Sequence, residues 1–313
     1  MSPAHPATEP TVSVRLGAHK YGKAENRLVR ITRDTARHEI EDLTITSQLR
    51  GAAFADSFLT GDNSRIIATD TQKNTVFALA KIHGVGSPER FLTLLAEHFT
   101  SSFDWVEGGL WQAEQYAWER IVAEGAAHDH AFVRKGQGTR LATVQVADGA
   151  THMTGGVRDL VVLKSTGSEF WGYPKTEYTT LPETTDRIMA TSVTARWRYL
   201  PDAVAAGVDY NAVHEAVVAQ LLEQFAVVHS LALQQTLYEM GRAALASCPE
   251  LAEIRFAMPN KHHFAYDLAR FGLDNDNEVF IADDRPYGLI EGTVVRDGAA
   301  DAPAAWRDVP SFV

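Results

Sequence analysis

The sequence has very little cysteine and no long apolar run. Cys248 is the only cysteine among 313 residues, so no disulfide can form within the chain and a reducing compartment is expected. No stretch of about 18 apolar residues occurs, which predicts no membrane-spanning helix and no membrane partner. Basic residues are outnumbered, because 29 Lys and Arg face 40 Asp and Glu for a net charge of −11. This balance argues against nucleic acid as a partner.

Signatures of common enzyme classes and metal sites are also missing. No Gly-x-Ser-x-Gly turn and no His-Glu-x-x-His helix occurs, and Gly136 and Gly138 lack the strand–helix context of a phosphate loop. Two histidine pairs, His128 with His130 and His262 with His263, could bind metal or move protons. No cysteine or carboxylate stands at metal-ligand spacing near His262 and His263, and a metal site shared by the two pairs is only weakly indicated, so we predict no metal. We interpret His128 and His130 as a surface turn and assign them no function.

The expected elements occur in the same order in both halves of the chain. Alternating apolar and polar residues predict strands, while apolar residues three and four apart predict helices. Strands are expected at 11–16, 27–32, 39–47, 105–120, 131–146, 157–164, 188–199, 253–258, 263–268, 278–281 and 289–296. One helix pair begins near Thr69 and at Ser87, and a second pair covers 210–228 and 231–247. Cys248, at the end of the last helix, is expected to pack in the core.

This order predicts an α+β protein with antiparallel sheets and helices on one face. We divide the chain into a disordered tail (1–12), a first repeat (13–150), a second repeat (151–300) and a C-terminal tail (301–313). Open sheets of this kind leave unpaired edges, and nothing obvious in the sequence blocks them. A homo-oligomer, with sheets joined into a barrel, is therefore expected.

Residues 164–187 form the most unusual segment. It contains six threonines, four aromatic residues, two glycines and two prolines, and it shows neither helical nor strand periodicity. Such a segment is typical of a site for a flat polar ligand, with rings that stack on it and Arg187 to bind its edge. The alternative for Arg187 is an ion pair with Glu183 or Asp186.

Three further positions have a functional and a structural interpretation. Thr69 or Asp70 could cap a helix, or the free amides of that helix start could bind an anion or carbonyl. Gln234 opens a helix that we place at the matching position of the second half, and its amide could read a carbonyl and an N–H together. Lys23 follows the first strand, either as a solvated edge residue or as a proton relay with a lowered pKa.

Taken together, these motifs resemble those of the urate oxidase (uricase) family, over about residues 21–296. They are specific and occur in order. The motifs are Tyr21-Gly22-Lys23, Ala68-Thr69-Asp70 with Lys73-Asn74-Thr75, Lys164-Ser165-Thr166 through Phe170-Trp171-Gly172, Tyr178-Thr179-Thr180-Leu181 with Glu183-Thr184 and Asp186-Arg187, Leu233-Gln234 with Thr236, and Pro259-Asn260-Lys261-His262. The resemblance implies the tunnelling fold, with two ββααββ-type repeats, and a homotetramer that encloses a tunnel and holds its active sites at subunit interfaces.

The resemblance also implies a role for each motif residue. Phe170 would stack on the purine, while Arg187 and Gln234 bind its pyrimidine edge and the Leu233 amide adds a donor. Other roles follow for the remaining positions. Thr69 and Asp70 of a neighbouring subunit would bind the five-membered ring. Lys23, Thr69 and His262 would form the proton relay, and Asn260 and Thr69 would form the pocket for dioxygen or water.

The implied reaction is oxidation of urate by dioxygen to 5-hydroxyisourate and hydrogen peroxide, the first step of urate degradation towards allantoin. No cofactor is implied, because deprotonated urate is itself the reductant and dioxygen is a co-substrate. The C-terminus lacks a peroxisomal tripeptide, so a bacterial, cytoplasmic enzyme is expected. Two alternatives remain: a tunnelling-fold pterin enzyme, for which an acidic anchor would suit better than Arg187, and a purine-binding protein that has lost catalysis.

Overall fold

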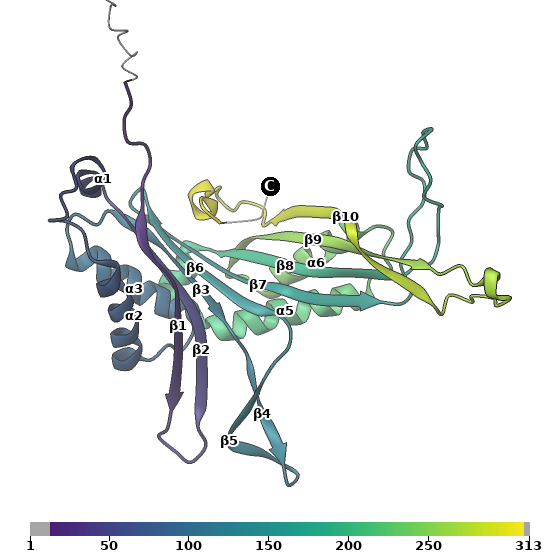
Figure 1. Cartoon of the computed structure of the whole chain (residues 1–313), viewed down its shortest axis with the longest axis horizontal. Helices are drawn as coiled ribbons and strands as arrows, with labels where there is room; N and C mark the ends of the chain where they lie inside the picture. The colour runs from purple at the N-terminus through teal and green to yellow at the C-terminus, as the bar shows by residue number, and fades with distance from the viewer. Residues whose placement is uncertain (1–12, 310–313) are drawn as a thin grey trace, which may run out of the picture.

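One antiparallel sheet of eight strands organises the chain, in the order β1-β2-β3-β6-β7-β8-β9-β10 (Figure 1). The computed structural model describes residues 13–309, so the predicted disordered tail at 1–12 lies outside the described residues. A separate hairpin, β4–β5, projects from the sheet. The strands are β1 (Tyr21–Thr32), β2 (Glu39–Arg50), β3 (Gly108–Gln115), β4 (Trp118–Ala123), β5 (Ala126–Arg134), β6 (Thr139–Ala147), β7 (Ala150–Lys164), β8 (Met189–Tyr199), β9 (Leu251–Ala265) and β10 (Phe280–Val295).

The four long helices lie against one face of this sheet (Figure 1). The long ones are α2 (Thr69–His83), α3 (Pro88–Ser102), α5 (Tyr210–Val227) and α6 (Leu233–Ser247), and the short ones are α1 (Ala55–Thr60) and α4 (Pro201–Ala206) with 3-10 turns η1 (Ala52–Phe54), η2 (Ala269–Phe271) and η3 (Pro303–Trp306). Each half of the chain places its long helix pair between its second and third sheet strands. The predicted α+β fold with two ββααββ units is confirmed.

Apolar side chains facing the helices build the core. In β8 the odd-numbered residues from Met189 to Trp197 are fully buried, and the even-numbered residues between them face the other side of the sheet. In α3 the apolar stripe of Phe91, Leu92, Leu95 and Phe99 is completely buried, and the Ser87 hydroxyl caps the helix by accepting from the Arg90 amide. Cys248 is 2 % exposed, as expected for a packing role.

A buried ion pair joins the two halves beneath the sheet. Arg140 on β6 donates to Glu89 on α3 at 2.7 Å and to Asn211 on α5 at 2.7 Å. Glu89 is fully buried, and burial raises the pKa of its carboxyl above the usual value. The position of α5 relative to α3 therefore depends on one buried cation.

Several predicted strands differ from the observed ones. The predicted strand at 11–16 is wrong for its described part, because residues 13–16 have no regular structure and β1 begins at Tyr21. The two predicted strands at 253–258 and 263–268 form one strand, β9, and those at 278–281 and 289–296 form β10. Pro259 does not end β9, since proline is tolerated where its missing N–H is not needed.

None of the helices among the described residues is both long and apolar enough to cross a membrane. The cytoplasmic location stays a prediction.

Candidate active site

The first group of predicted site residues lies where β1 passes the start of α2. The Tyr21 hydroxyl accepts from the Ile67 amide at 2.8 Å and so fixes the chain just before the helix. Neither Thr69 nor Asp70 is the cap: α2 begins at Thr69, and its N-cap residue, Ala68, makes no side-chain hydrogen bond. The capping interpretation is therefore wrong, and the exposed first turn of α2 keeps its amide donors.

Asp70 is occupied by its own helix. Its carboxylate accepts from Lys73 at 2.5 Å and from Asn74 at 2.9 Å. The hydrogen bond from Lys73 is the largest cause of a lowered Asp70 pKa, and the charge of Lys23 adds to it. Lys23 therefore lies close to the start of α2, and the structure brings Lys23, Thr69 and Asp70 together.

The second group contains the Phe170 ring and the Arg187 guanidinium. Phe170 is held by a bridge to Thr184, with N–O distances of 2.8 and 3.0 Å, and the Arg187 amide donates to Ser168 at 2.9 Å. These bonds place the guanidinium carbon 5.1 Å from the centre of the Phe170 ring. Ring and cation thus share one small surface at the foot of the 165–187 loop, which stands away from the sheet (Figure 1).

Arg187 makes no ion pair with the two carboxylates that the sequence offered. Glu183 accepts from the Gly172 amide and from Lys175, and Asp186 accepts from Thr166. Within residues 13–309 the guanidinium has no hydrogen-bond partner, and its Nε is buried. Burial lowers the pKa of Arg187, as expected for a cation without a counter-ion. The structural alternative for Arg187 is therefore wrong.

Backbone pairing brings the start of α6 to the same place. The Ser230 amide donates to Gly167 at 2.9 Å, and the Glu169 amide donates to Ser230 at 2.7 Å. Helix α6 then begins at Leu233, and its N-cap residue, Ala232, makes no side-chain hydrogen bond. Leu233 is buried and its neighbour Gln234 is exposed. The helix start thus presents free amides and the Gln234 side chain.

The placement of α6 corrects one expectation. It is the second long helix of its half, whereas α2 is the first of the other half, so the two starts are not at matching positions. They share a different property. The other two long helices, α3 and α5, have side-chain caps from Ser87 and Asp209, and α2 and α6 do not. The two uncapped starts are those that the sequence motifs singled out.

Strand β9 supplies Asn260 and His262. Asn260 pairs with Thr191 on β8 and Gly288 on β10, and His262 pairs with Asp283 just before a register shift in β10. Burial is the largest cause of a lowered His262 pKa, and the charge of Arg187 lowers it further, while Asp283 opposes both. His262 therefore lies within the field of Arg187, and its neutral form is favoured near neutral pH.

Within one chain the first group (Lys23, Thr69 and Asp70) lies far from the second, which includes Asn260 and His262 on β9. Lys23 is on β1, at one edge of the sheet, and His262 is on β9, the sixth strand along from β1. At about 4.8 Å per strand this separation is roughly 29 Å. One copy of the chain therefore cannot bring Lys23 and Thr69 to His262.

Sequence reasoning missed one neighbour of Phe170. Tyr173 stacks on the Phe170 ring with centroids 4.8 Å apart and planes 18° apart, and its hydroxyl donates to Leu181 at 2.6 Å. The sequence predicts that Tyr173 shapes the wall of the pocket without touching the motif residues, and its contact with Phe170 corrects the second point. The spacing of aromatic residues at 170 and 173 was the available signal, but without a known backbone path it did not distinguish a ring partner from a loop residue.

The comparisons with known proteins identify the family. A model of the uricase family matches residues 19–145 and 153–291. This chain belongs to the uricase family. The uricase of Arthrobacter globiformis is 52% identical over 97% of this chain and 98% of its own length, and that of Oryctolagus cuniculus is 39% identical over 88% and 93%. The crystal structure of the Arthrobacter globiformis uricase superposes with a TM-score of 0.89 at 53% identity, covering 95% of this chain and all of that one.

For residues 13–309, no group of three or more His, Cys, Asp or Glu side chains is arranged to hold a metal ion. His128 and His130 pack against each other, with ring centroids 4.5 Å apart, and His130 lies 5.8 Å from His38. His128 and His130 both lie on β5 in the projecting hairpin, so the predicted surface turn is wrong for these two residues.

Proposed function

We propose that this chain oxidises urate with dioxygen and water to 5-hydroxyisourate and hydrogen peroxide. The observation that supports it best is the unpaired Arg187 guanidinium beside the Phe170 ring and the uncapped start of α6. Urate is flat, anionic and rich in alternating carbonyl and N–H groups. A ring face, a guanidinium and free amides are the partners that such a ligand needs.

The second group of residues would bind the substrate. The purine would stack on Phe170, and Arg187 would donate two charge-assisted hydrogen bonds to one side of its pyrimidine edge. Gln234 would contact the other side, and the Leu233 amide, at the uncapped start of α6, would add a donor. The field of Arg187 and of the helix start favours the urate anion over neutral urate.

The first group would supply chemistry from a neighbouring copy. Thr69 and Asp70 would contact the five-membered ring, and Lys23, Thr69 and His262 would relay the protons that leave urate and reach the peroxide. The balance is closed without another reagent: urate gives up two electrons, dioxygen takes them with two protons as hydrogen peroxide, and the hydroxyl of water adds to the purine carbon. Asn260 with Thr69 would hold dioxygen and then water above the ring.

No cofactor is needed in this scheme, because the bound urate anion is the reductant. A direct test adds urate to metal-stripped protein in air. We expect urate absorbance to fall with an equal yield of peroxide. Binding without turnover would support a purine-binding protein instead, and activity that requires added zinc would contradict the cofactor-free scheme.

We also propose a homotetramer in which neighbouring copies complete each site. The separation of Lys23 from His262 by six strand spacings supports this, and so do the sheet edges at β1 and β10, which can pair with another copy. Mixing two impaired variants, assayed with urate well below the Kd of Arg187→Met, tests the idea. Thr69→Val and Arg187→Met proteins, unfolded together and reassembled, should recover about a quarter of the wild-type sites, since a mixed interface holds one intact site. If each site belonged to one chain, mixing would recover nothing.

A further inference from the structure

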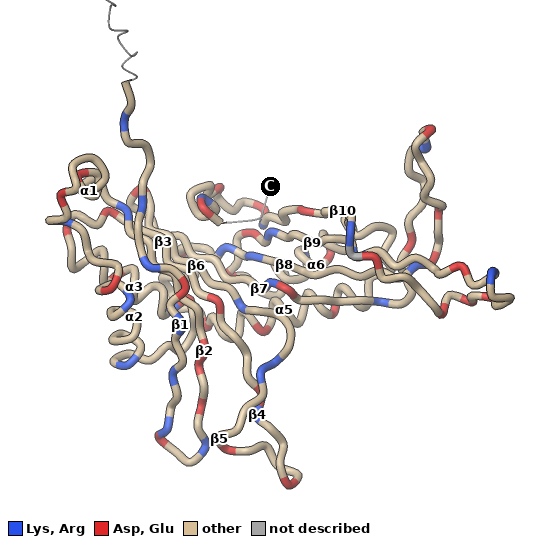
Figure 2. The backbone as a smooth tube through the Cα atoms, in the orientation of Figure 1, with Lys and Arg blue, Asp and Glu red and all other residues tan. Residues whose placement is uncertain are grey.

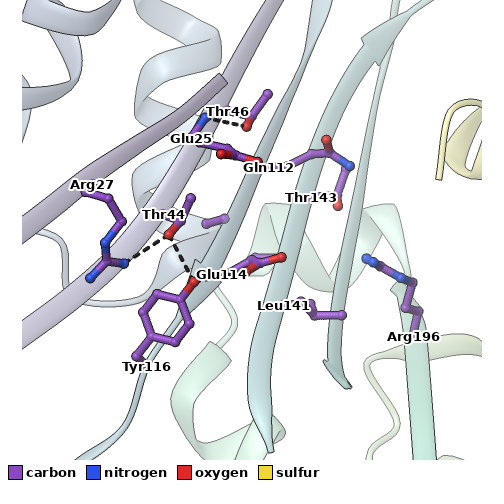
Figure 3. Close-up of a pocket in the computed structure, with 12 residues that line it drawn as sticks. Glu25, Arg27, Thr44, Thr46, Gln112, Glu114, Tyr116, Leu141, Thr143 and Arg196 are labelled. Atoms are coloured by element: carbon purple, nitrogen blue, oxygen red, sulfur yellow. Dashed lines mark hydrogen bonds between the residues drawn. The ribbon is translucent and has the colours of Figure 1, made fainter. Parts of the chain in front are cut away.

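The face of the sheet opposite the four long helices contains a polar cavity that the proposed reaction does not use. Its volume is about 460 Å³, and Figure 3 shows its walls formed by side chains from β1, β2, β3, β6 and β8. The residues that matter here are Gln112, Glu114, Thr143 and Arg196. None of them belongs to either group of candidate active-site residues.

Cross-strand pairing explains why this hollow exists. One row across the sheet runs Glu114, Leu141, Gly156 and Arg196, and the neighbouring row includes Thr143. Paired residues project from the same face, so Gly156 leaves the first row without a side chain. The Arg196 side chain lies over this gap: a Cβ at position 156 would be only 3.1 Å from Arg196 Cγ. The glycine thus directs the arginine along the sheet, into the cavity (Figure 3).

Arg196 is the buried cation of this face that lacks a counter-ion. It is 9 % exposed, its Nε is buried, and the described part of the chain offers its guanidinium no hydrogen bond or ion pair. The other arginines nearby are engaged: Arg27 with Asp42, Arg158 with Glu114 at 2.8 Å, and Arg198 with Glu253 at 2.6 Å. Burial lowers the pKa of Arg196 to about 10, so the charge of Glu114 does not compensate for lost solvation.

The cavity also contains a second unpaired donor. Thr143 is 2 % exposed, and its hydroxyl has no partner among residues 13–309. A guanidinium can only donate hydrogen bonds, so whatever fills the cavity must accept them. Water would satisfy the donors but leave a buried charge unpaired, which costs several kcal/mol by the usual estimate. An anion satisfies both requirements.

We propose that Arg196 and the Thr143 hydroxyl bind a small inorganic anion, a halide or a small oxyanion, in this cavity. The ligand carries a single charge, because Arg196 is the one lining cation without a partner among residues 13–309 and the exposed Glu25 carboxylate lies across the cavity from it (Figure 3). Binding would remove the cost of the buried charge and so stabilise the sheet away from the candidate active site. The proposal does not rest on urate oxidation and can be tested without substrate.

The test uses the assembled protein with chloride as the probe. Gluconate, a bulky and strongly hydrated anion, is replaced by chloride at constant ionic strength. We expect the unfolding midpoint to rise by about 2–4 °C once chloride reaches tenfold its Kd. Chloride-35 NMR line broadening should report the same binding. Arg196→Met should abolish both effects, and Thr143→Val should weaken binding at least threefold.

Arg27→Met is the matched control, because Arg27 lines the same cavity but is paired with Asp42. It should keep both chloride effects. Arg196→Met should be no less stable than wild type in gluconate, since it removes an unpaired buried charge; if it fails to fold, the Thr143 variant decides. Line broadening that survives in Arg196→Met but is lost in Arg187→Met would place the ion in the candidate active site. Chloride-independent stability of the wild type, with loss of the oligomer in Arg196→Met, would show that a neighbouring copy supplies the counter-ion. Either outcome would overturn the proposal.

Discussion

Replacing Arg187 with methionine tests the substrate-binding group most sharply. Methionine keeps much of the length of arginine but has no charge and no N–H donors. In the structure the guanidinium has no protein partner within the described residues, and burial already lowers its pKa. Its removal therefore leaves no carboxylate unpaired. We expect the free energy of unfolding of Arg187→Met to equal or exceed that of the wild type.

The expected loss of affinity follows from the contacts that the guanidinium is free to make. A charge-assisted hydrogen bond contributes about 1.5–3 kcal/mol, which corresponds to roughly 10- to 150-fold weaker binding. The loss should appear in Kd, since the proposed contact is made with bound urate before any bond changes. Protein stability and ligand affinity are thus predicted to move in different directions, which a general structural defect would not produce.

Urate can be used as its own probe when dioxygen is absent. Anaerobic titration calorimetry gives Kd for wild type and variant without turnover, and thermal unfolding of the same samples gives stability. Lys175→Met is the control, because Lys175 belongs to the same loop and pairs with Glu183 on the surface. A Kd of Arg187→Met within twofold of the wild type, or an equal loss in Lys175→Met, would refute the edge-binding role.

Three further predictions concern the relay, its pH dependence and the core. Lys23→Met and Thr69→Val should lower kcat about 100-fold or more with little change in anaerobic urate Kd, and unchanged kcat would remove both from the relay. Burial lowers the His262 pKa below its ordinary value of 6.5, so His262 should stay neutral and act as a base at more acidic pH. The acid limb of the kcat–pH profile should therefore lie below pH 6.5. Arg140→Met should lower the free energy of unfolding by about 3–5 kcal/mol in denaturant titrations, because Glu89 is left buried without its cation. The double variant with Glu89→Gln should recover part of that loss.

The sequence predicted the fold well where its periodicity reflects burial on one face. Helix α5 was expected at 210–228 and runs Tyr210–Val227, because an Asp209 cap and an apolar stripe both mark it. Strand ends were predicted poorly. Alternation also occurs at 11–16, which forms no strand where described, and the residues around Pro259 belong to one long strand. Local pattern cannot reveal whether a partner strand continues past such a residue.

The candidate site divides in the same way. Family motifs marked every residue of both groups. The sequence by itself did not show that Arg187 would be free of Glu183 and Asp186. That outcome depends on which backbone amides and lysines reach those carboxylates first. Nor could the sequence show that Tyr173 stacks on Phe170, since a loop of this composition can be built with or without that contact. Contacts that depend on loop path are set by tertiary structure.

The distribution of charged residues along the chain (Figure 2) bears on both Arg187 and the start of α6. A chain of net charge −11 repels anions at long range, so an anionic substrate must be attracted locally. The structure provides this attraction through an unpaired Arg187 and an α6 start without a side-chain cap. Both features cost stability in the empty protein, because a cap and an ion pair would each be favourable there. Their presence together at the foot of one loop is difficult to explain by folding alone, and it is expected if the ligand supplies the missing negative charge.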